Sequence, residues 1–182
     1  MDNSPFKHTV SIDLSIVIVS FNTKHLLLDC LESVQKNTTG LTSEIFVVDN
    51  ASKDGSADAV SKFFPQVYLI RNQENKGLSA ADNQAFRKSR GRYLIHLSSD
   101  TALLENSFLK IVQFLDQNHG FSVLSPKIID EANLPYPMRL RQDCPKDALL
   151  KILGKYDCAD EIKEMAGNKP RKVEAIGGPC FA

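Results

Sequence analysis

The sequence predicts an α/β domain in which a mostly parallel sheet carries helices on both faces. Two observations predict it: short runs of apolar, often β-branched residues, and helical segments that alternate with these runs. Parallel strands are usually buried on both faces, and the connection between two of them is usually a helix. Right-handed crossovers then favour the strand order 3-2-1-4 of a doubly wound sheet.

The chain begins its regular structure with a strand and a helix. Residues 14–19 (LSIVIV) form a continuous apolar run, as expected for a strand that is buried on both faces. In residues 24–37, leucine and valine recur at intervals of four and three, which places them on one face of a helix. Residues 44–48 (EIFVV) predict the second strand, and either Asp54 or Ser56 is placed to cap a short helix after it.

The following segments repeat this alternation. Residues 67–70 (VYLI) predict the third strand, and residues 77–89 predict a helix with small and apolar residues on its inner face. Residues 93–97 (YLIHL) predict the fourth strand, and the last helix of this series begins near Glu105. Strand and helix thus alternate four times, which is the pattern of an α/β domain.

Composition excludes several classes of protein. The 182 residues suffice for one well-buried core, and the balance of 22 basic against 22 acidic residues argues against a nucleic-acid partner. No apolar run reaches the roughly 18 residues of a membrane span, and the polar start does not resemble a signal peptide. We therefore expect a cytoplasmic protein, either free or peripheral at the inner face of the membrane. The cysteines have no metal-binding or redox spacing, so we expect reduced thiols at Cys30, Cys144, Cys158 and Cys180.

Polar side chains follow three of the four predicted strands at the point where each strand ends. In the order 3-2-1-4 the first and fourth strands are neighbours, so their ends meet at the switch point where ligands bind. The end of the second strand lies beside them. The residues at this edge are Ser20, Phe21 and Asn22 after the first strand, Asp49 and Asn50 after the second, and Ser98, Ser99 and Asp100 after the fourth.

Asp100 has the most specific chemistry at this edge. An unpaired carboxylate at the end of an apolar strand is unfavourable unless water, a charge or a metal compensates it. Mg²⁺ or Mn²⁺ often takes one or two carboxylates and completes its shell with substrate phosphates and waters. A cap on the helix near Glu105, or a turn through Thr101, explains the same residue equally well. The sequence lacks GxGxxG and GxxxxGK[ST], which argues against dehydrogenases and P-loop proteins.

Three segments carry a resemblance to a known family: LSIVIVSFNTKHLLLDCLESV, EIFVVDNASKDGSADAV and VYLIRNQENKGLSAADNQAFRKSRGRYLIHLSSDT. In this order they resemble the nucleotide-sugar-binding half of family 2 glycosyltransferases, which have the GT-A (Rossmann-like) fold, and especially the rhamnosyltransferase-like branch. The resemblance covers residues 13–130. It implies an enzyme that moves a sugar from a nucleotide-sugar donor to an acceptor hydroxyl, usually in the synthesis of cell-surface polysaccharide.

The resemblance assigns roles to the loops after the first two strands. It implies that Ser20, Phe21 and Asn22 contact the nucleotide base and ribose. A helix cap is a second role open to Asn22. It also implies that Asp49 accepts a hydrogen bond from the base, as the imide N–H of a pyrimidine requires, and that Asn50 belongs to the same binding loop.

The loop before the third helix resembles the family's loop that closes over the donor. Its residues are Asn75, Lys76 and Gly77, and Lys76 either faces a phosphate or lies in a solvated turn whose glycine provides backbone freedom. Relatives often have arginine where this chain has Asp82. We expect Asp82 to occupy a solvent-facing position of the helix without a catalytic role.

The residues Ser98, Ser99 and Asp100 stand where the family has its D-x-D element. The first acidic position has become Ser98, so Asp100 is the one certain carboxylate left to bind Mg²⁺ or Mn²⁺. Relatives with asparagine at that position suggest that one carboxylate suffices. His96, inside the fourth strand, is expected to be a hydrogen-bonded core residue.

The mechanism that the resemblance implies is direct displacement at the anomeric carbon, with inversion. A divalent ion would neutralise the charge that grows on the departing nucleoside diphosphate, and a second carboxylate would deprotonate the acceptor. In the family that base follows a strand resembled by residues 176–182 (IGGPCFA), so we expect it beyond Ala182. We accordingly divide the chain into a disordered or extended tail (1–12), a nucleotide-sugar-binding core (13–130) and the start of a truncated acceptor-side region (131–182).

The expected partners are a nucleotide-sugar donor and a saccharide or lipid-linked acceptor. Two alternatives remain open at this point. A catalytically incomplete module would bind the donor without transferring the sugar. A nucleotidyltransferase would also use an α/β sheet and a metal, but it should have a glycine-rich and basic loop after the first strand, which SFNTKH does not supply.

Overall fold

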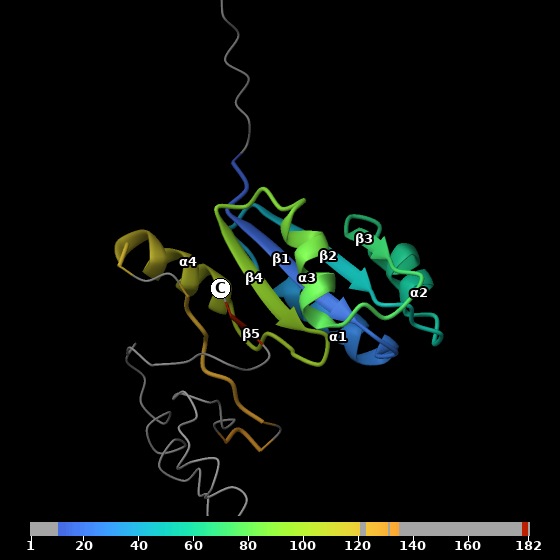
Figure 1. The fold of residues 1–182 in the computed structure, drawn as a ribbon. Helices are drawn as coiled ribbons and strands as arrows, with labels where there is room; N and C mark the ends of the chain where they lie inside the picture. Colours follow the sequence, from blue (N-terminus) through green and yellow to red (C-terminus); the bar gives the residue numbers. More distant parts are fainter. Residues whose placement is uncertain (1–10, 121–122, 131, 135–179, 182) are drawn as a thin grey trace, which may run out of the picture.

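The computed structural model of the chain describes residues 11–120, 123–130, 132–134 and 180–181. Five strands form one sheet: β1 (Leu14–Ser20), β2 (Ser43–Asp49), β3 (Tyr68–Arg71), β4 (Tyr93–Ser98) and β5 (Cys180–Phe181). Their order is β3-β2-β1-β4-β5 (Figure 1). The first four strands are parallel, as predicted, and β5 runs antiparallel to β4 and extends the sheet at that edge.

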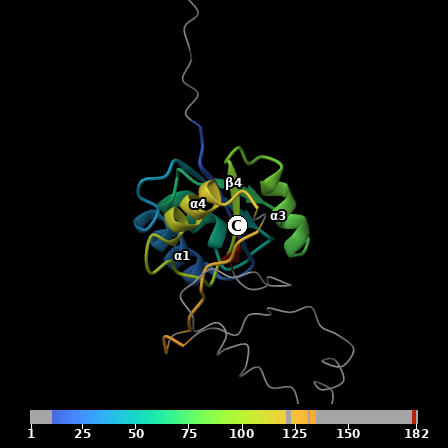
Figure 2. The same ribbon diagram turned by 90° about the vertical axis from the view of Figure 1, so that its left-hand side faces the viewer.

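Helices cover both faces of the sheet. They are α1 (Lys24–Lys36), α2 (Ser56–Phe63), α3 (Leu78–Phe86) and α4 (Ser107–Gln117). In Figure 2, α3 lies on the opposite side of β4 from α1 and α4. The predicted fold class and the predicted strand order are therefore confirmed.

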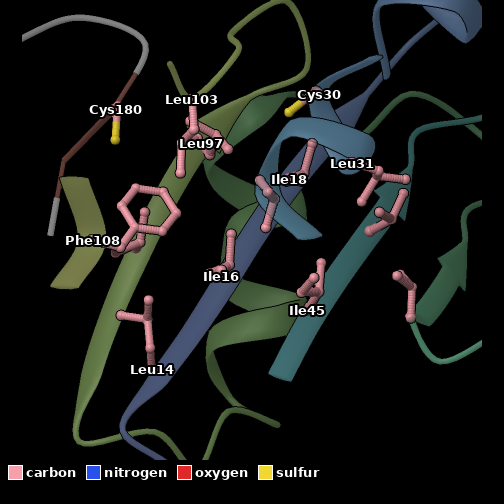
Figure 3. Packing of buried hydrophobic residues seen from close by; sticks show 14 of the residues in the cluster. Leu14, Ile16, Ile18, Cys30, Leu31, Ile45, Leu97, Leu103, Phe108 and Cys180 are labelled. Carbon is pink, nitrogen blue, oxygen red and sulfur yellow. The ribbon is translucent and has the colours of Figure 1, made fainter. Parts of the chain in front are cut away.

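The larger hydrophobic core lies between the sheet and the helices α1 and α4. Alternate residues of β1, namely Leu14, Ile16 and Ile18, point into it and are fully buried. They pack with Leu31 of α1 and Phe108 of α4 (Figure 3). Because successive side chains of a strand point to opposite faces, this layer accounts for only half of the apolar run in β1.

The other half of that run packs under α3. Val17 of β1 forms a smaller buried cluster with Phe46 and Val48 of β2 and with Ala81 and Ala85 of α3. The two alanines have short side chains, so they let α3 lie close to the sheet. The continuous apolar pattern of β1 thus reflects burial on both faces.

The amino ends of the strands are fixed by a buried carboxylate. Glu44 Oε1 accepts hydrogen bonds from Ser15 Oγ (2.6 Å) and from the backbone N–H of Arg90 (2.6 Å). Ser15 Oγ in turn accepts from Gly91 N (2.8 Å). A Cβ atom at residue 91 would lie 2.5 Å from Ser15 N, so only glycine lets the α3–β4 connection approach β1 this closely.

An exposed cluster at the same end of the sheet links β4 to α4. Arg92 donates hydrogen bonds to Asp13 Oδ1 (3.0 Å) and Asp116 Oδ1 (2.8 Å), and Tyr93 donates to Asp116 Oδ1 (2.7 Å). The hydrogen bonds from Arg92 and Tyr93 lower the pKa of Asp116. A side-chain hydrogen bond from Thr42, with further help from Arg92, lowers the pKa of Asp13.

Some expectations fall on residues outside the described part of the chain. These are the tail over residues 1–10, most of the acceptor-side region, and the thiols of Cys144 and Cys158. Cys30 and Cys180 are buried free thiols, as expected, and burial raises the pKa of each to about 12. Among the helices that the structure describes, none combines the length and the apolar character needed to cross a bilayer.

Candidate functional site

The polar residues predicted to share one edge of the sheet do lie together. Ser20 pairs with Asp49 in the register of β1 and β2, and Val19 pairs with Ser98 in the register of β1 and β4. The carboxyl ends of the first and fourth strands are therefore neighbours. Loops 20–23, 49–55 and 98–101 leave the sheet at this common edge.

Asn22 joins the loop after β1 to the loop after β2. Its backbone N–H donates to Ser52 Oγ (2.9 Å), and its Oδ1 accepts from the backbone N–H of Lys53 (2.8 Å). Asn22 has a left-handed backbone (φ 56°), and Thr23 is the N-cap residue of α1. The helix cap considered for Asn22 is therefore wrong. Phe21, between Asn22 and the strand, has 47% of its surface exposed.

One carboxylate serves the first residues of two helices. Asp54 Oδ2 accepts from the backbone N–H of Lys24 (2.8 Å), the first residue of α1. Its Oδ1 accepts from the backbone N–H (3.0 Å) and the hydroxyl (2.5 Å) of Ser56, the first residue of α2. Partial burial acts to raise the pKa of Asp54, but the hydrogen bonds from Ser56 and Lys24 together lower it. Gly55 is the N-cap residue of α2, so neither Asp54 nor Ser56 is the N-cap as predicted. The carboxylate of Asp54 nevertheless satisfies the first N–H of both α2 and α1.

Asp49 presents a buried acceptor at the end of β2. The residue is 4% exposed, and its Oδ2 accepts from the backbone N–H of Ser52 (3.1 Å). Its Oδ1 is buried and has no hydrogen-bond partner among the described residues. A buried carboxylate oxygen without a donor is unfavourable, so this atom is suited to accept a hydrogen bond from a ligand N–H.

Asn50 organises the loop before α3. Its Nδ2 donates to Asn75 Oδ1 (2.8 Å), and its Oδ1 accepts from Asn72 Nδ2 (3.0 Å) and from the backbone N–H of Lys76 (3.0 Å). Asn75 Oδ1 also accepts from Gly77 N (2.9 Å), and Gly77 has φ 77°. The side chain of Lys76 is left on the exposed surface. Asn50 therefore acts on this loop by holding its shape.

Asp100 lies in the turn that ends β4. The backbone N–H of Thr101 donates to the carbonyl of Ser98 (3.1 Å), so the expected turn is present. Asp100 does not cap the next helix, because Asn106 is the N-cap residue of α4 and accepts from Leu109 N (3.3 Å). Asp100 is exposed, and within the described chain its carboxylate has no hydrogen-bond or ion-pair partner.

A cleft of about 960 Å³ opens beside Asp100. It lies between the end of β4, the start of α4 and residues 126–130 and 133. Leu104 and Ile128 contribute apolar surface, and Lys127 and Asp130 contribute charged groups. The cleft offers space for a ligand larger than an ion next to the carboxylate.

The residues at this edge fit one kind of metal site. The described residues contain no group of three or more histidine, cysteine, aspartate or glutamate side chains that would enclose an ion. Asp100 supplies a single unpartnered carboxylate, which is a hard oxygen ligand. This donor set fits Mg²⁺ or Mn²⁺ whose other ligands come from substrate phosphates and water.

Thr23 is a residue of this site that the sequence did not reveal. Its Oγ1 lies 2.9 Å from Ser20 Oγ and 3.0 Å from Ser99 Oγ, so one hydroxyl bridges the ends of β1 and β4. Ser20 and Ser99 are both buried. A threonine before a helix is normally interpreted as a cap, and its partner Ser99 is 76 residues away in sequence.

Asp82 lies in the protein interior, against our expectation. It is 8% exposed, and its Oδ1 lies 2.9 Å from Nδ1 of His96, which is 3% exposed. Asp82 faces the sheet from the same side of α3 as Ala81 and Ala85. The expected solvent-facing position was wrong because a histidine in β4 pairs with this carboxylate. The expectation that His96 is a hydrogen-bonded core residue is confirmed.

Sequence comparison relates the chain to sugar-transferring enzymes. The family model described as "Glycosyl transferase family 2" matches residues 15–177. An uncharacterized glycosyltransferase of Haemophilus influenzae is 33% identical over 111 residues, which cover 61% of this chain and 37% of the relative. The Escherichia coli UDP-Glc:alpha-D-GlcNAc-diphosphoundecaprenol beta-1,3-glucosyltransferase WfgD is 28% identical over 78% of this chain and 56% of its own length. The chain thus spans less than two thirds of either relative.

Solved structures share the fold at low sequence identity. S. aureus TarS 1–349 in complex with UDP-GlcNAc matches with a TM-score of 0.60 and 22% identity, over 70% of this chain and 38% of TarS. The mannosyltransferase PcManGT from Pyrobaculum calidifontis, in complex with GDP-Man and Mn²⁺, matches with a TM-score of 0.58 and 20% identity, over 92% of this chain and 55% of PcManGT. At these identities the likeness establishes the fold.

Proposed function

The chain belongs to glycosyl transferase family 2, and from this membership we propose that it is the donor-binding part of an enzyme that transfers a sugar from a nucleotide sugar to an acceptor hydroxyl with inversion. One observation carries the proposal: Asp100 lies beside a cleft at the edge where β1, β2 and β4 deliver their polar residues. The names of relatives that use or bind UDP-sugars support the same activity.

In this proposal the nucleoside lies across the ends of β1 and β2. The buried Oδ1 of Asp49 lacks a donor among the described residues, and a base N–H supplies one. Phe21 is about half exposed one residue beyond β1, where an aromatic face suits stacking on a base. Ser20 and Asn22 complete the loop that approaches the ribose.

The loop of Asn75, Lys76 and Gly77 approaches the phosphates. The ammonium group of Lys76 is exposed at the start of α3, and a cation of this kind suits a phosphate. Asn50 supports this contact indirectly, because its side-chain oxygen accepts a hydrogen bond from the backbone N–H of Lys76 and so holds the loop in place. Asn50 therefore contributes to binding through the loop that it holds.

Asp100 would hold Mg²⁺ or Mn²⁺ together with the phosphates of the donor. When bound, such an ion stabilises the negative charge that grows on the departing nucleoside diphosphate. Ser98 and Ser99 stand in the same turn and add polar groups to this end of the site. The Mn²⁺ in the PcManGT complex is a property of that relative and supports the choice of ion.

The cleft beside Asp100 receives the transferred sugar and the acceptor. Its combination of apolar and charged walls suits a saccharide or a lipid-linked saccharide. Attack by the acceptor hydroxyl opposite the departing phosphate inverts the anomeric carbon, and a carboxylate base would remove the proton of that hydroxyl. We place the protein in the cytoplasm, peripheral at the inner face of the membrane when the acceptor is lipid-linked. One relative is named for an acceptor linked to diphosphoundecaprenol and another for teichuronic acid biosynthesis, and both names support a role in polysaccharide synthesis.

Thermal denaturation with nucleoside diphosphates tests this function. We expect UDP, GDP or dTDP with MnCl₂ to raise the melting temperature of the wild-type chain. Asp100→Ala should remove the metal-dependent part of the shift and leave the metal-independent part. Asp49→Asn should reduce both parts, because an amide oxygen is a weaker acceptor than a carboxylate. Asp29→Ala, at an exposed carboxylate of α1, is the matched control and should behave as wild type.

The absence of a shift with all three nucleotides would contradict the proposed function. A shift that Asp100→Ala leaves intact would contradict the metal site alone. Turnover of a nucleotide sugar then distinguishes a transferase from a module that binds the donor without transferring its sugar.

A further inference from the structure

Thr23 occupies the position of a helix cap without acting as one. It is the N-cap residue of α1, with φ −126° and ψ 38°, yet its side chain makes no capping hydrogen bond. The N–H of Lys24, which begins the helix, is satisfied by Asp54 from the loop after β2. The hydroxyl of Thr23 is therefore available for contacts away from the helix.

That hydroxyl forms the centre of a chain of three. Thr23 Oγ1 contacts Ser20 Oγ at 2.9 Å and Ser99 Oγ at 3.0 Å, and these serines are 1% and 8% exposed. Each hydroxyl has one proton and two lone pairs, so Thr23 either donates to one serine and accepts from the other or accepts from both. The two hydrogen bonds use two of the three protons, so one proton is left over on Ser20, Thr23 or Ser99, according to the directions of the bonds.

We propose that Thr23 is a positioning residue that joins the nucleotide loop after β1 to the Asp100 turn after β4. The proposal rests on the function proposed above. With a donor bound, the hydroxyls run from Ser20 through Thr23 to Ser99, and Ser99 donates its remaining proton to a phosphate oxygen. Thr23 thereby holds the turn at the place where Asp100 meets the cation that accompanies the phosphates.

The burial of the two serines makes this link difficult for water to replace. Thr23→Val preserves the shape of the side chain but leaves Ser20 and Ser99 without their common partner. A buried hydroxyl that loses its partner is unfavourable, so the turn of Asp100 is expected to shift or to loosen. Thr23→Ser retains the hydroxyl and should retain the link.

The test measures the affinity for a nucleoside diphosphate by calorimetry, with and without MnCl₂. The probe is whichever of UDP, GDP and dTDP the wild-type chain binds most tightly. The quantity compared is the factor by which Mn²⁺ improves the affinity. In Thr23→Val we expect this factor to fall roughly tenfold, the scale of one lost hydrogen bond. In Thr23→Ser it should stay within about twofold of wild type, because the bond is kept.

Two further variants keep the test decisive. Thr38→Val lies just beyond the other end of α1 and removes a hydroxyl bonded to a helix carbonyl at 2.8 Å, so it controls for the loss of a threonine hydroxyl alone. It should bind as wild type does. Ser99→Ala breaks the same link from the other side. It should reproduce the loss, and it replaces Thr23→Val if that variant does not fold.

The possible outcomes separate the two proposals. If the wild-type chain binds and Thr23→Val or Ser99→Ala keeps the full effect of Mn²⁺, the positioning role is wrong and the proposed function stands. An equal loss in Thr38→Val would also overturn the role, because the effect would then be one of general stability. If the wild-type chain binds none of the three nucleotides, the proposed function fails and this inference fails with it.

Discussion

Removing the carboxylate of Asp54 should destabilise the fold through two helices at once. Asp54→Ala deletes the acceptor for the first N–H of α1 and of α2. The loss of a side-chain cap destabilises a helix by about 1 kcal/mol, so we expect the free energy of unfolding to fall by about 2 kcal/mol. Urea denaturation at pH 7, followed by circular dichroism, measures this quantity.

Two further variants test whether the expected fall in the free energy of unfolding comes from these two hydrogen bonds. Asp54→Asn keeps one side-chain oxygen, which can serve one helix, so its loss should be about 1 kcal/mol. Asp58→Ala removes a carboxylate of α2 whose side chain is 82% exposed and which pairs with Arg71 at 2.7 Å. An exposed ion pair of this kind contributes about 0 to 1 kcal/mol, so Asp58→Ala should be close to wild type.

The effect of Asp54 should also depend on pH in a defined direction. Its pKa in the folded protein lies below the ordinary value of 3.8, so its contribution is complete above about pH 4 and disappears as the pH falls through the lowered pKa. The stability curves of wild type and Asp54→Ala should therefore converge in acid. A loss at pH 7 no larger than that of Asp58→Ala would refute the role of Asp54 as the shared hydrogen-bond acceptor of the two helices.

Three other predictions follow from contacts away from the site. Gly91→Ala should lower the free energy of unfolding by about 3 kcal/mol in urea denaturation, because its Cβ would lie 2.5 Å from a backbone atom of Ser15. Cys30 and Cys180, with pKa values raised to about 12, should resist iodoacetamide at pH 8 until the protein is unfolded, as read by mass spectrometry; rapid alkylation of the folded chain would contradict their burial. Arg92→Gln should make the melting temperature fall less steeply below about pH 4, because the pKa values of its two aspartate partners return towards 3.8; an unchanged acid slope would contradict this.

The strands, and the sheet edge at which they end, could be predicted because the residue pattern that specifies each strand lies within that strand. A strand buried on both faces requires a continuous apolar run, and residues 14–19 provide one. The rules for parallel connections then place the first and fourth strands side by side. The residues at or just beyond the ends of those strands, such as Ser20 and Asp100, must therefore lie at the same edge of the sheet, whatever contacts their side chains make.

The pairing of side chains across that edge could not be predicted in the same way. Asp82 was interpreted from its own helix and Thr23 was not singled out, because their partners His96 and Ser99 lie 14 and 76 residues away in the sequence. A carboxylate on a helix appears solvent-facing until a buried histidine is known to pack against it. That Asn50 belongs to the nucleotide-binding loop stays a prediction, but the sequence did not indicate that its carboxamide holds the loop before α3.

The hydrogen bonds between the loops after β1 and β2 have a consequence for exchanging sequence among homologues. Asn22 binds Ser52 and Lys53, and Asp54 binds Lys24, so each loop holds the conformation of the other. A chimera that imports residues 20–24 alone would inherit only one half of each reciprocal contact. Under the proposed function, an exchange of donor preference between homologues should therefore succeed when residues 20–24 and 49–56 are transplanted together.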